Sequence, residues 1–120
     1  MVIDSSIWLE IFLDGPLGEK CEREISKGSI FVPSLVHFEV YKCLRKKSND
    51  HEALQAVGKL ASYHCLELTQ KISIAAADLS ISLKLSMADS IVLAHAKHLK
   101  VSLLTLDYDF AEIAGAKVLR

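Results

Sequence analysis

The feature that most constrains the fold of this chain is an alternation between short apolar runs and longer segments with helical periodicity. The apolar runs have the length of buried strands and occupy residues 2–3, 30–32, 65–68, 102–106 and 117–119. Short, continuous apolar strands separated by helices are typical of a parallel sheet covered on both faces. The sequence therefore predicts an α/β fold with a mostly parallel, five-stranded sheet between helices.

The segments between these runs carry apolar residues at helical spacing. The first, from residue 5 or 6, ends at Asp14-Gly15-Pro16, and a polar surface helix is expected over 17–26. A helix over 35–47 with an apolar stripe and a second over 51–62 form a predicted hairpin. Further helices are predicted around 72–83, 87–99 and 110–114.

Composition limits the class of protein. The 120 residues suit a single domain over 1–120, and with 51% hydrophobic residues the chain can build a packed core. Because the net charge is −1, any binding to nucleic acid must depend on a local patch. No apolar run reaches the roughly 20 residues of a membrane span, and no basic region opens a signal peptide. Three cysteines without a paired spacing predict reduced, mostly buried thiols in a cytoplasmic protein.

Acidic residues occur at the ends of the predicted strands. Asp4 ends the first strand, and Asp107 and Asp109 follow the strand over 102–106. Glu39 lies in the second turn of the helix entered from the second strand, and Asp89 lies at the start of the helix before the fourth. Ligands of open α/β sheets bind beyond the carboxyl ends of the strands, so these side chains are candidates for one site.

Each acid also has a purely structural explanation. Asp4 and Asp109 can cap the helices that follow them, and Asp107 can shape a turn. Ser86-Met87-Ala88-Asp89 matches a capping box, and Glu39 can be a solvated helix residue.

Taken together, the acids indicate a metal site. Several carboxylates in contact repel one another, and a hard divalent cation such as Mg²⁺ or Mn²⁺, which prefers oxygen ligands, relieves that repulsion. The chain has no phosphate-binding GxxxxGK[ST] loop, no HExxH helix and no Cys/His pair with zinc spacing.

Four segments resemble the acidic motifs of PIN-domain proteins, specifically the VapC-like toxin ribonucleases of type II toxin–antitoxin pairs. They occur in the family's order along the whole chain and are VIDSSIWLE from Val2, FEV from Phe38, SMADSIVLA from Ser86 and LTLDYDF from Leu104. The resemblance implies a three-layer α/β/α fold and a metal-dependent ribonuclease whose products carry 5′-phosphate and 3′-hydroxyl ends. It also implies a homodimer and an antitoxin encoded beside the toxin.

By position in these motifs, the resemblance implies roles for individual residues. Asp4, Glu39 and Asp89 would be the core metal-binding acids and Asp107 the fourth, all four catalytic. Asp109 would be an auxiliary metal-binding acid, and Ser6 would support the ligands from behind them.

Because an acidic pocket repels RNA, a cationic surface is expected nearby. Lys42, Arg45 and Lys46 follow Glu39, and Lys42 and Lys46 share its helical face. They are candidates for RNA binding, and the alternative is a basic last turn that complements the helix dipole.

Several other side chains have two possible roles. His95 and His98 are expected at the surface, because an i, i+3 pair without a cysteine is a poor zinc site. Tyr108 can stack on an unpaired base or pack over the sheet edge. Trp8 and Phe12 are expected in the core, and their alternative is a groove for an antitoxin helix or a second subunit.

Two other functions were weighed. A response-regulator receiver has a similar size and an acidic pocket, but it needs a second acid beside the first, an Asp after the third strand and a Lys after the fifth, which this chain lacks. A PIN-like module that binds partners without catalysis is the other alternative, and it leaves the repulsion among intact acids without a purpose.

Overall fold

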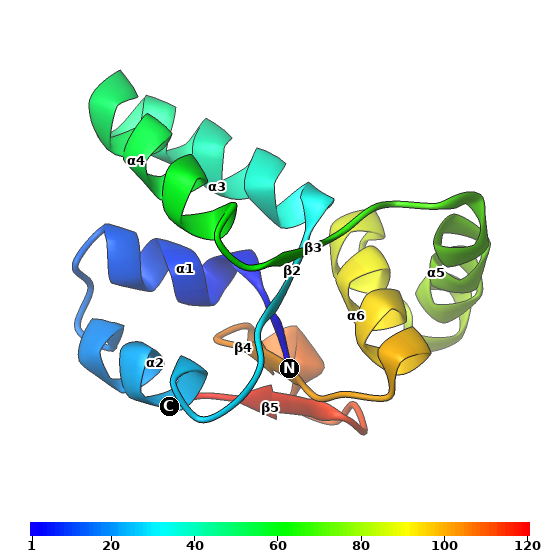
Figure 1. Cartoon of the computed structure of the whole chain (residues 1–120). Helices are drawn as coiled ribbons and strands as arrows, with labels where there is room; N and C mark the ends of the chain where they lie inside the picture. The colour runs from blue at the N-terminus through cyan, green and yellow to red at the C-terminus, as the bar shows by residue number, and fades with distance from the viewer.

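The computed structural model describes residues 1–120 and contains a five-stranded, wholly parallel sheet (Figure 1). The strand order is β3-β2-β1-β4-β5. The bounds are β1 Val2–Ile3, β2 Phe31–Pro33, β3 His64–Leu66, β4 Leu103–Thr105 and β5 Ala116–Val118. The predicted α/β fold with a parallel sheet is confirmed.

The topology reverses between β1 and β4. From β1 the chain winds outward through β2 to β3, returns through two helices to β4 on the other side of β1, and ends at β5. In open α/β sheets the connections leave the two strands at such a point in opposite directions, which opens a crevice at their carboxyl ends. The crevice here lies beyond Ile3 and Thr105.

Helices cover both faces of the sheet (Figure 1). On one side lie α1 and α2 together with the α3–α4 hairpin, and on the other lies α6, with α5 packed outside it. The helix bounds are α1 Ser5–Phe12, α2 Gly18–Ile25, α3 Ser34–Lys47, α4 Asp50–Leu60, α5 Gln70–Leu83 and α6 Met87–Leu99. A 3₁₀ turn, η1, spans Tyr108–Phe110.

The main core joins the sheet to α1, α3, α4 and α6. Trp8 is fully buried at its centre, stacked on Phe12 and tilted against Tyr63, with ring centroids 6.0 and 5.4 Å away. The structure therefore favours the core role for Trp8 over an exposed groove. A smaller apolar cluster of Ile72, Ala76, Ile91 and Ala94 fixes α5 to α6.

The element boundaries were predicted to within a few residues, with two shifts at the sheet edges. β3 is His64–Leu66 rather than 65–68, and the short helix expected over 110–114 is the 3₁₀ turn Tyr108–Phe110. The second shift arises because the Asp107 carboxylate accepts a hydrogen bond from the Asp109 amide (2.9 Å), which starts the turn two residues earlier.

Burial of the cysteines and of one histidine differs from the prediction. All three cysteines are free, but only Cys21 is buried, while Cys43 is half-buried and Cys65 exposed. His95 is buried rather than at the surface, because α6 is enclosed by the sheet on one side and α5 on the other, whereas His98 is exposed as expected.

No single helix has both the length and the apolar composition to cross a membrane. The pair α5 and α6 has both only when the two are taken together, and they are bent by 114° at their junction.

Candidate metal centre

The crevice between β1 and β4 gathers the acids that the sequence placed at strand ends. Asp4 is the residue directly after β1 and Asp107 comes two residues after β4, and the two strands are paired neighbours. α6 brings the Asp89 side chain to the same place from its first turn. The parallel arrangement accounts for the convergence of Asp4 and Asp107, since the carboxyl ends of neighbouring strands meet at one edge, and the packing of α6 adds Asp89.

Asp4 is the deepest of these acids, with 6% of its surface exposed, and two hydroxyl groups hold it. The Ser6 hydroxyl donates to Asp4 Oδ2 over 2.9 Å and the Thr105 hydroxyl donates to the same oxygen over 2.7 Å. Asp4 makes no side-chain capping bond to α1, so its carboxylate is directed at the crevice and not at the helix end. The geometry therefore does not favour the alternative role of Asp4 as the side-chain cap of α1.

Ser6 and Thr105 also fix the loop that follows β4. The Leu106 amide donates to the Ser6 hydroxyl and the Asp107 amide donates to the Thr105 hydroxyl, both over 3.0 Å. The Thr105 hydroxyl thus holds both the Asp4 carboxylate and the Asp107 amide, and the Ser6 hydroxyl holds both the Asp4 carboxylate and the Leu106 amide. The predicted supporting position of Ser6 agrees with this geometry. Thr105 was missed, although its signal was present as the one hydroxyl residue in the apolar run 103–106.

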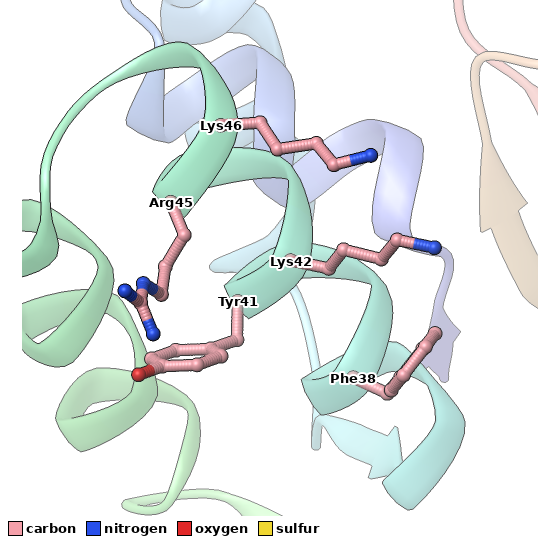
Figure 2. Close-up of a pocket in the computed structure, with 5 residues that line it drawn as sticks. All are labelled: Phe38, Tyr41, Lys42, Arg45 and Lys46. Atoms are coloured by element: carbon pink, nitrogen blue, oxygen red, sulfur yellow. The ribbon is translucent and has the colours of Figure 1, made fainter.

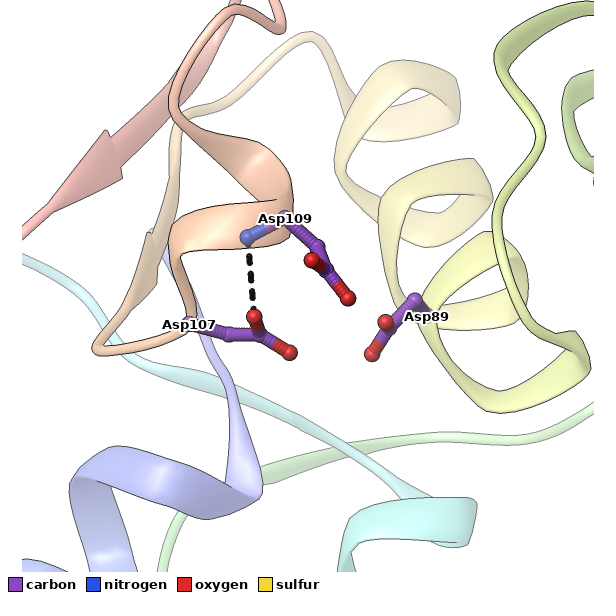
Figure 3. Close-up of side chains that lie close together, drawn as sticks. All are labelled: Asp89, Asp107 and Asp109. Carbon is purple, nitrogen blue, oxygen red and sulfur yellow. Dashed lines mark hydrogen bonds between the residues drawn. The ribbon is translucent and has the colours of Figure 1, made fainter.

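Asp89, Asp107 and Asp109 form the tightest group of carboxylates in the crevice (Figure 3). One carboxylate oxygen from each residue lies within 4.8 Å of those of the other two. Figure 3 shows Asp107, the residue before η1, and Asp109 on η1 facing Asp89 across the gap to α6, with the Asp109 amide bonded to Asp107. Asp109, expected only as an auxiliary, is a full member of this group.

The capping box predicted at Ser86 is formed in one direction. The Ser86 hydroxyl accepts a hydrogen bond from the Asp89 amide over 3.3 Å, so the serine caps α6. This bond uses the backbone of Asp89 and leaves its carboxylate free to face Asp107 and Asp109. The cap and the acidic group are therefore compatible.

The electrostatics of the crevice are those of crowded like charges. The pKa of Asp89 is raised from 3.8 to about 6, first because burial disfavours its charged form, and then because Asp107 and Asp4 repel it. Without a cation, this carboxyl group is thus poorly tolerated as an anion.

Glu39 borders the crevice from α3 and is not part of the tight group. Its pKa is also raised, first by burial and then by the charge of Asp4, while a hydrogen bond from Ser5 acts in the opposite direction. The charge of Asp4 thus acts on both Asp89 and Glu39, and Glu39 also responds to the charge of Asp89, although neither Asp4 nor Glu39 belongs to the tight group.

The predicted cationic residues lie on the outer surface of α3. Lys42, Arg45 and Lys46 are all exposed, and only Arg45 has an ion-pair partner, Asp50, at 2.9 Å. Tyr108, beside the acids, is exposed, and the Arg120 guanidinium lies 5.3 Å from its ring centre.

Comparison with known proteins gives the same fold. The PIN domain family model matches residues 1–116. A toxin–antitoxin complex from Klebsiella pneumoniae superposes with a TM-score of 0.82 at 22% identity, covering 98% of this chain and 95% of that one. VapC20 of Mycobacterium tuberculosis, described as a sarcin–ricin loop cleaving toxin, gives 0.83 at 16% identity, with 98% and 97% covered.

A third structure, VapBC2 from Rickettsia felis bound to a DNA fragment from its promoter, gives a TM-score of 0.78 at 15% identity, with 99% and 98% covered. No curated protein matches the sequence. The resemblance drawn from the four motifs and the three-layer architecture that it implied are both confirmed.

Proposed function

This chain belongs to the PIN domain family, and on that basis we propose that it is a Mg²⁺- or Mn²⁺-dependent endoribonuclease, the toxin of a toxin–antitoxin pair. The observation that carries the proposal is the convergence of Asp89, Asp107 and Asp109 in the crevice between β1 and β4, with the buried Asp4 near them and Glu39 at the border. Its similarity in fold to VapC20 and to toxin–antitoxin complexes supports the same conclusion.

The donor set fits a hard divalent cation. All of the groups are carboxylates, which Mg²⁺ and Mn²⁺ prefer, and no cysteine or histidine belongs to the group. The raised pKa of Asp89 means that a cation in the crevice removes a repulsion already present in the fold. We assign Asp4, Glu39, Asp89 and Asp107 as the catalytic and metal-binding acids, with Asp109 as a further ligand.

When bound, such a cation supplies an activated water and neutralises charge on the phosphate as it is attacked. The protein residues determine where this happens. The hydroxyls of Ser6 and Thr105 keep the Asp4 carboxylate in one orientation, and the 3₁₀ turn holds Asp107 and Asp109 toward Asp89. No nucleophilic side chain is required, which agrees with the products of 5′-phosphate and 3′-hydroxyl type that the family resemblance implies.

Binding of the RNA needs positive charge beside this acidic crevice, and α3 provides it. Lys42, Arg45 and Lys46 lie on the helix that carries Glu39, one to two turns beyond it. Their charges attract the phosphate backbone to the edge of the site.

Two protein partners complete the proposal. One is an antitoxin encoded beside this chain, since the similar structures include toxin–antitoxin complexes. The other is a second copy of the chain. The outer face of α5 is its candidate contact, because Ile74, Ile81 and the adjacent Met87 are 59%, 79% and 72% exposed.

Neither alternative function is favoured by an observation. A receiver of the CheY type has strand order 2-1-3-4-5, whereas this sheet has order 3-2-1-4-5. A non-catalytic module would keep a group of mutually repelling carboxylates at a cost in stability.

Cleavage of RNA tests the proposal directly. The parent protein should cut RNA in Mg²⁺ or Mn²⁺ and not in EDTA, and Asp4→Asn and Asp89→Asn should each abolish the cutting while the protein stays folded by circular dichroism. The conservative Glu112→Gln, at an exposed residue that is not a member of the acidic group, serves as the control. Cleavage by Asp89→Asn at the parent rate would refute the assignment.

The toxin role has a separate test. Expression of the parent protein should arrest growth, and co-expression of the adjacent small gene should restore it. RNA cleavage in vitro without growth arrest would instead indicate a nuclease of RNA processing.

A further inference from the structure

We infer that the outer surface of α3 is the path of an unpaired RNA strand, and that Phe38 is the residue on which one of its bases stacks. This inference rests on the proposed nuclease function and adds to it how the strand is held. It starts from an exposed aromatic side chain next to the site: Phe38 is 60% exposed and lies one residue from the half-buried Glu39.

The surface is hollowed, and the hollow reaches Glu39, at the border of the acidic crevice. A depression of about 450 Å³ is lined by Phe38, Tyr41, Lys42, Arg45 and Lys46 (Figure 2). A second depression of about 410 Å³ shares Phe38, Lys42 and Lys46 with the first and extends to Glu39 and Ser5. A strand lying in these two depressions therefore runs from the cationic row to the edge of the acids.

The side chains divide into an aromatic and a cationic part that suit a single strand. Figure 2 shows the ammonium groups of Lys42 and Lys46 on the same side of α3, with Arg45 on the other side beside Tyr41. The Lys42 ammonium lies 5.4 Å from the centre of the Phe38 ring, and the Arg45 guanidinium lies 5.8 Å from that of Tyr41. Neither lysine has an ion-pair partner, so both charges are available to phosphates.

An unpaired strand matches this arrangement better than a duplex does. Exposed aromatic rings beside cations bind single strands because each base offers a stacking face and each linkage offers a charge. In a duplex the bases are already paired and stacked, so Phe38 would find no partner. Phe38 and Lys46 are eight residues apart, which spans about 12 Å along the helix. This length holds three to four phosphates if the strand keeps the stacked rise of about 3.4 Å, and about two if the strand is extended.

The length of the path predicts a footprint. Affinity for unstructured oligoribonucleotides should rise until about two to four nucleotides lie on one side of the cleaved bond, and then level off. An affinity that is already maximal with one nucleotide on each side, or that rises evenly beyond ten, would overturn the inference.

Binding is measured by fluorescence anisotropy on an unstructured labelled oligoribonucleotide, in the Asp89→Asn background so that the strand stays intact. Phe38→Leu should weaken binding about 5- to 100-fold, the loss expected for one stacked base, and Phe38→Trp should restore it. The matched control is Leu54→Ala, since Leu54 is equally exposed (61%) on α4 and lines neither depression. Unchanged affinity in Phe38→Leu would overturn the inference.

An abasic oligonucleotide separates stacking from charge. Removing the stacked base should weaken binding to the protein with Phe38 and have no further effect in Phe38→Leu. Equal losses in both proteins would overturn the role of Phe38.

Salt dependence tests the two lysines. Lys42→Gln and Lys46→Gln should each reduce the slope of log affinity against log salt by about 0.7, while Lys71→Gln on α5 should leave it unchanged. An acidic peptide of equal charge that binds more tightly than the RNA, with no effect of Phe38→Leu, would assign this surface to a protein partner and overturn the inference.

These binding measurements do not depend on cleavage. Stacking and footprint as expected, with no cutting by the parent protein, would refute the nuclease and retain the RNA path. Metal-dependent cutting with no effect of Phe38→Leu on binding would retain the nuclease and refute the RNA path.

Discussion

Replacement of Asp89 by asparagine should make the metal-free protein more stable at neutral pH, although a charged group in its first helical turn is lost. In the folded chain the pKa of Asp89 is about 6, because burial and the charges of Asp107 and Asp4 disfavour its anion, against an ordinary value of 3.8. A difference of about 2 units corresponds to about 3 kcal/mol at most. Since Asp89 is partly exposed, solvent screening reduces this to about 1–2 kcal/mol.

The sign of the pH dependence follows from the direction of the shift. Below pH 4, Asp89 is protonated in the folded and unfolded chains alike, so it does not lower the free energy of unfolding. As the pH rises from about 4 to 6, the unfolded chain loses the proton first, so the free energy of unfolding falls. Above pH 6 the cost is complete, and the advantage of Asp89→Asn over the parent should reach its full value.

Urea unfolding in EDTA at pH 4 and pH 7.5 measures this difference. Trp8, the one tryptophan and fully buried, reports the loss of the core by fluorescence. The control is Asp78→Asn on the exposed face of α5, which should change stability little at either pH.

Added Mg²⁺ or Mn²⁺ should reverse the order of stability, because a ligand at 100 times its Kd adds about 2.7 kcal/mol to a protein that still binds it. An Asp89→Asn variant that is less stable than the parent by the same amount at both pH values would refute the reasoning. It would show that Asp89 serves α6 as a helix-terminal charge and does not repel its neighbours.

Three further changes test other parts of the structure. Thr105→Val should lower the affinity for Mn²⁺ about 10- to 100-fold, because Asp4 and the Asp107 amide lose the hydroxyl that they share. Thr105→Ser should recover the affinity, and titration calorimetry measures both. Equal affinities in the two variants would contradict this role of Thr105. Ile81→Glu should convert a dimer to a monomer in light scattering while Ile81→Leu does not, and a monomeric parent would contradict the proposed α5 contact. Gly115→Ala, at φ +89°, should destabilise by about 1 kcal/mol, whereas Gly58→Ala, in the last turn of α4, should stabilise by up to about 1 kcal/mol. The same sign in both would refute the conformational argument.

The sequence was informative about the fold and the edge of the sheet that carries the site, because both follow from local patterns. Strands this short and apolar must be covered on both sides, and an acid directly after such a strand must lie at its carboxyl end. Asp4 and Asp107 were placed in this way, by chain position alone.

Burial of α6 was harder to predict, because it depends on what packs around the helix. Residues 90–96 are all buried, including His95, since the sheet and α5 enclose them. A helix that is apolar all round is a signal of such a position, and the nearly continuous apolar run 91–96 carried it. The two-residue shift of η1 was likewise set by one hydrogen bond, from the Asp109 amide to Asp107.

The acidic group shows why the order of the acids along the chain does not reveal which of them lie closest together in the site. Asp109 lies two residues after Asp107, and in an extended strand its side chain would point the same way but about 7 Å further along. The 3₁₀ turn folds that distance back, so Asp109 meets Asp89 and Asp107 instead of leaving the site. Glu39 shares a helix with the cations of α3, and its place at the border, between Ser5 and the hollow that reaches Lys42, joins the acidic crevice to the surface that we assign to RNA. Burial and the charges of Asp4 and Asp89 raise the pKa of Glu39, and Glu39 is the one acid of the site that also lines the hollow shared with Lys42 and Lys46. Its carboxyl group therefore responds to the acidic crevice while it lies on the surface that we assign to RNA.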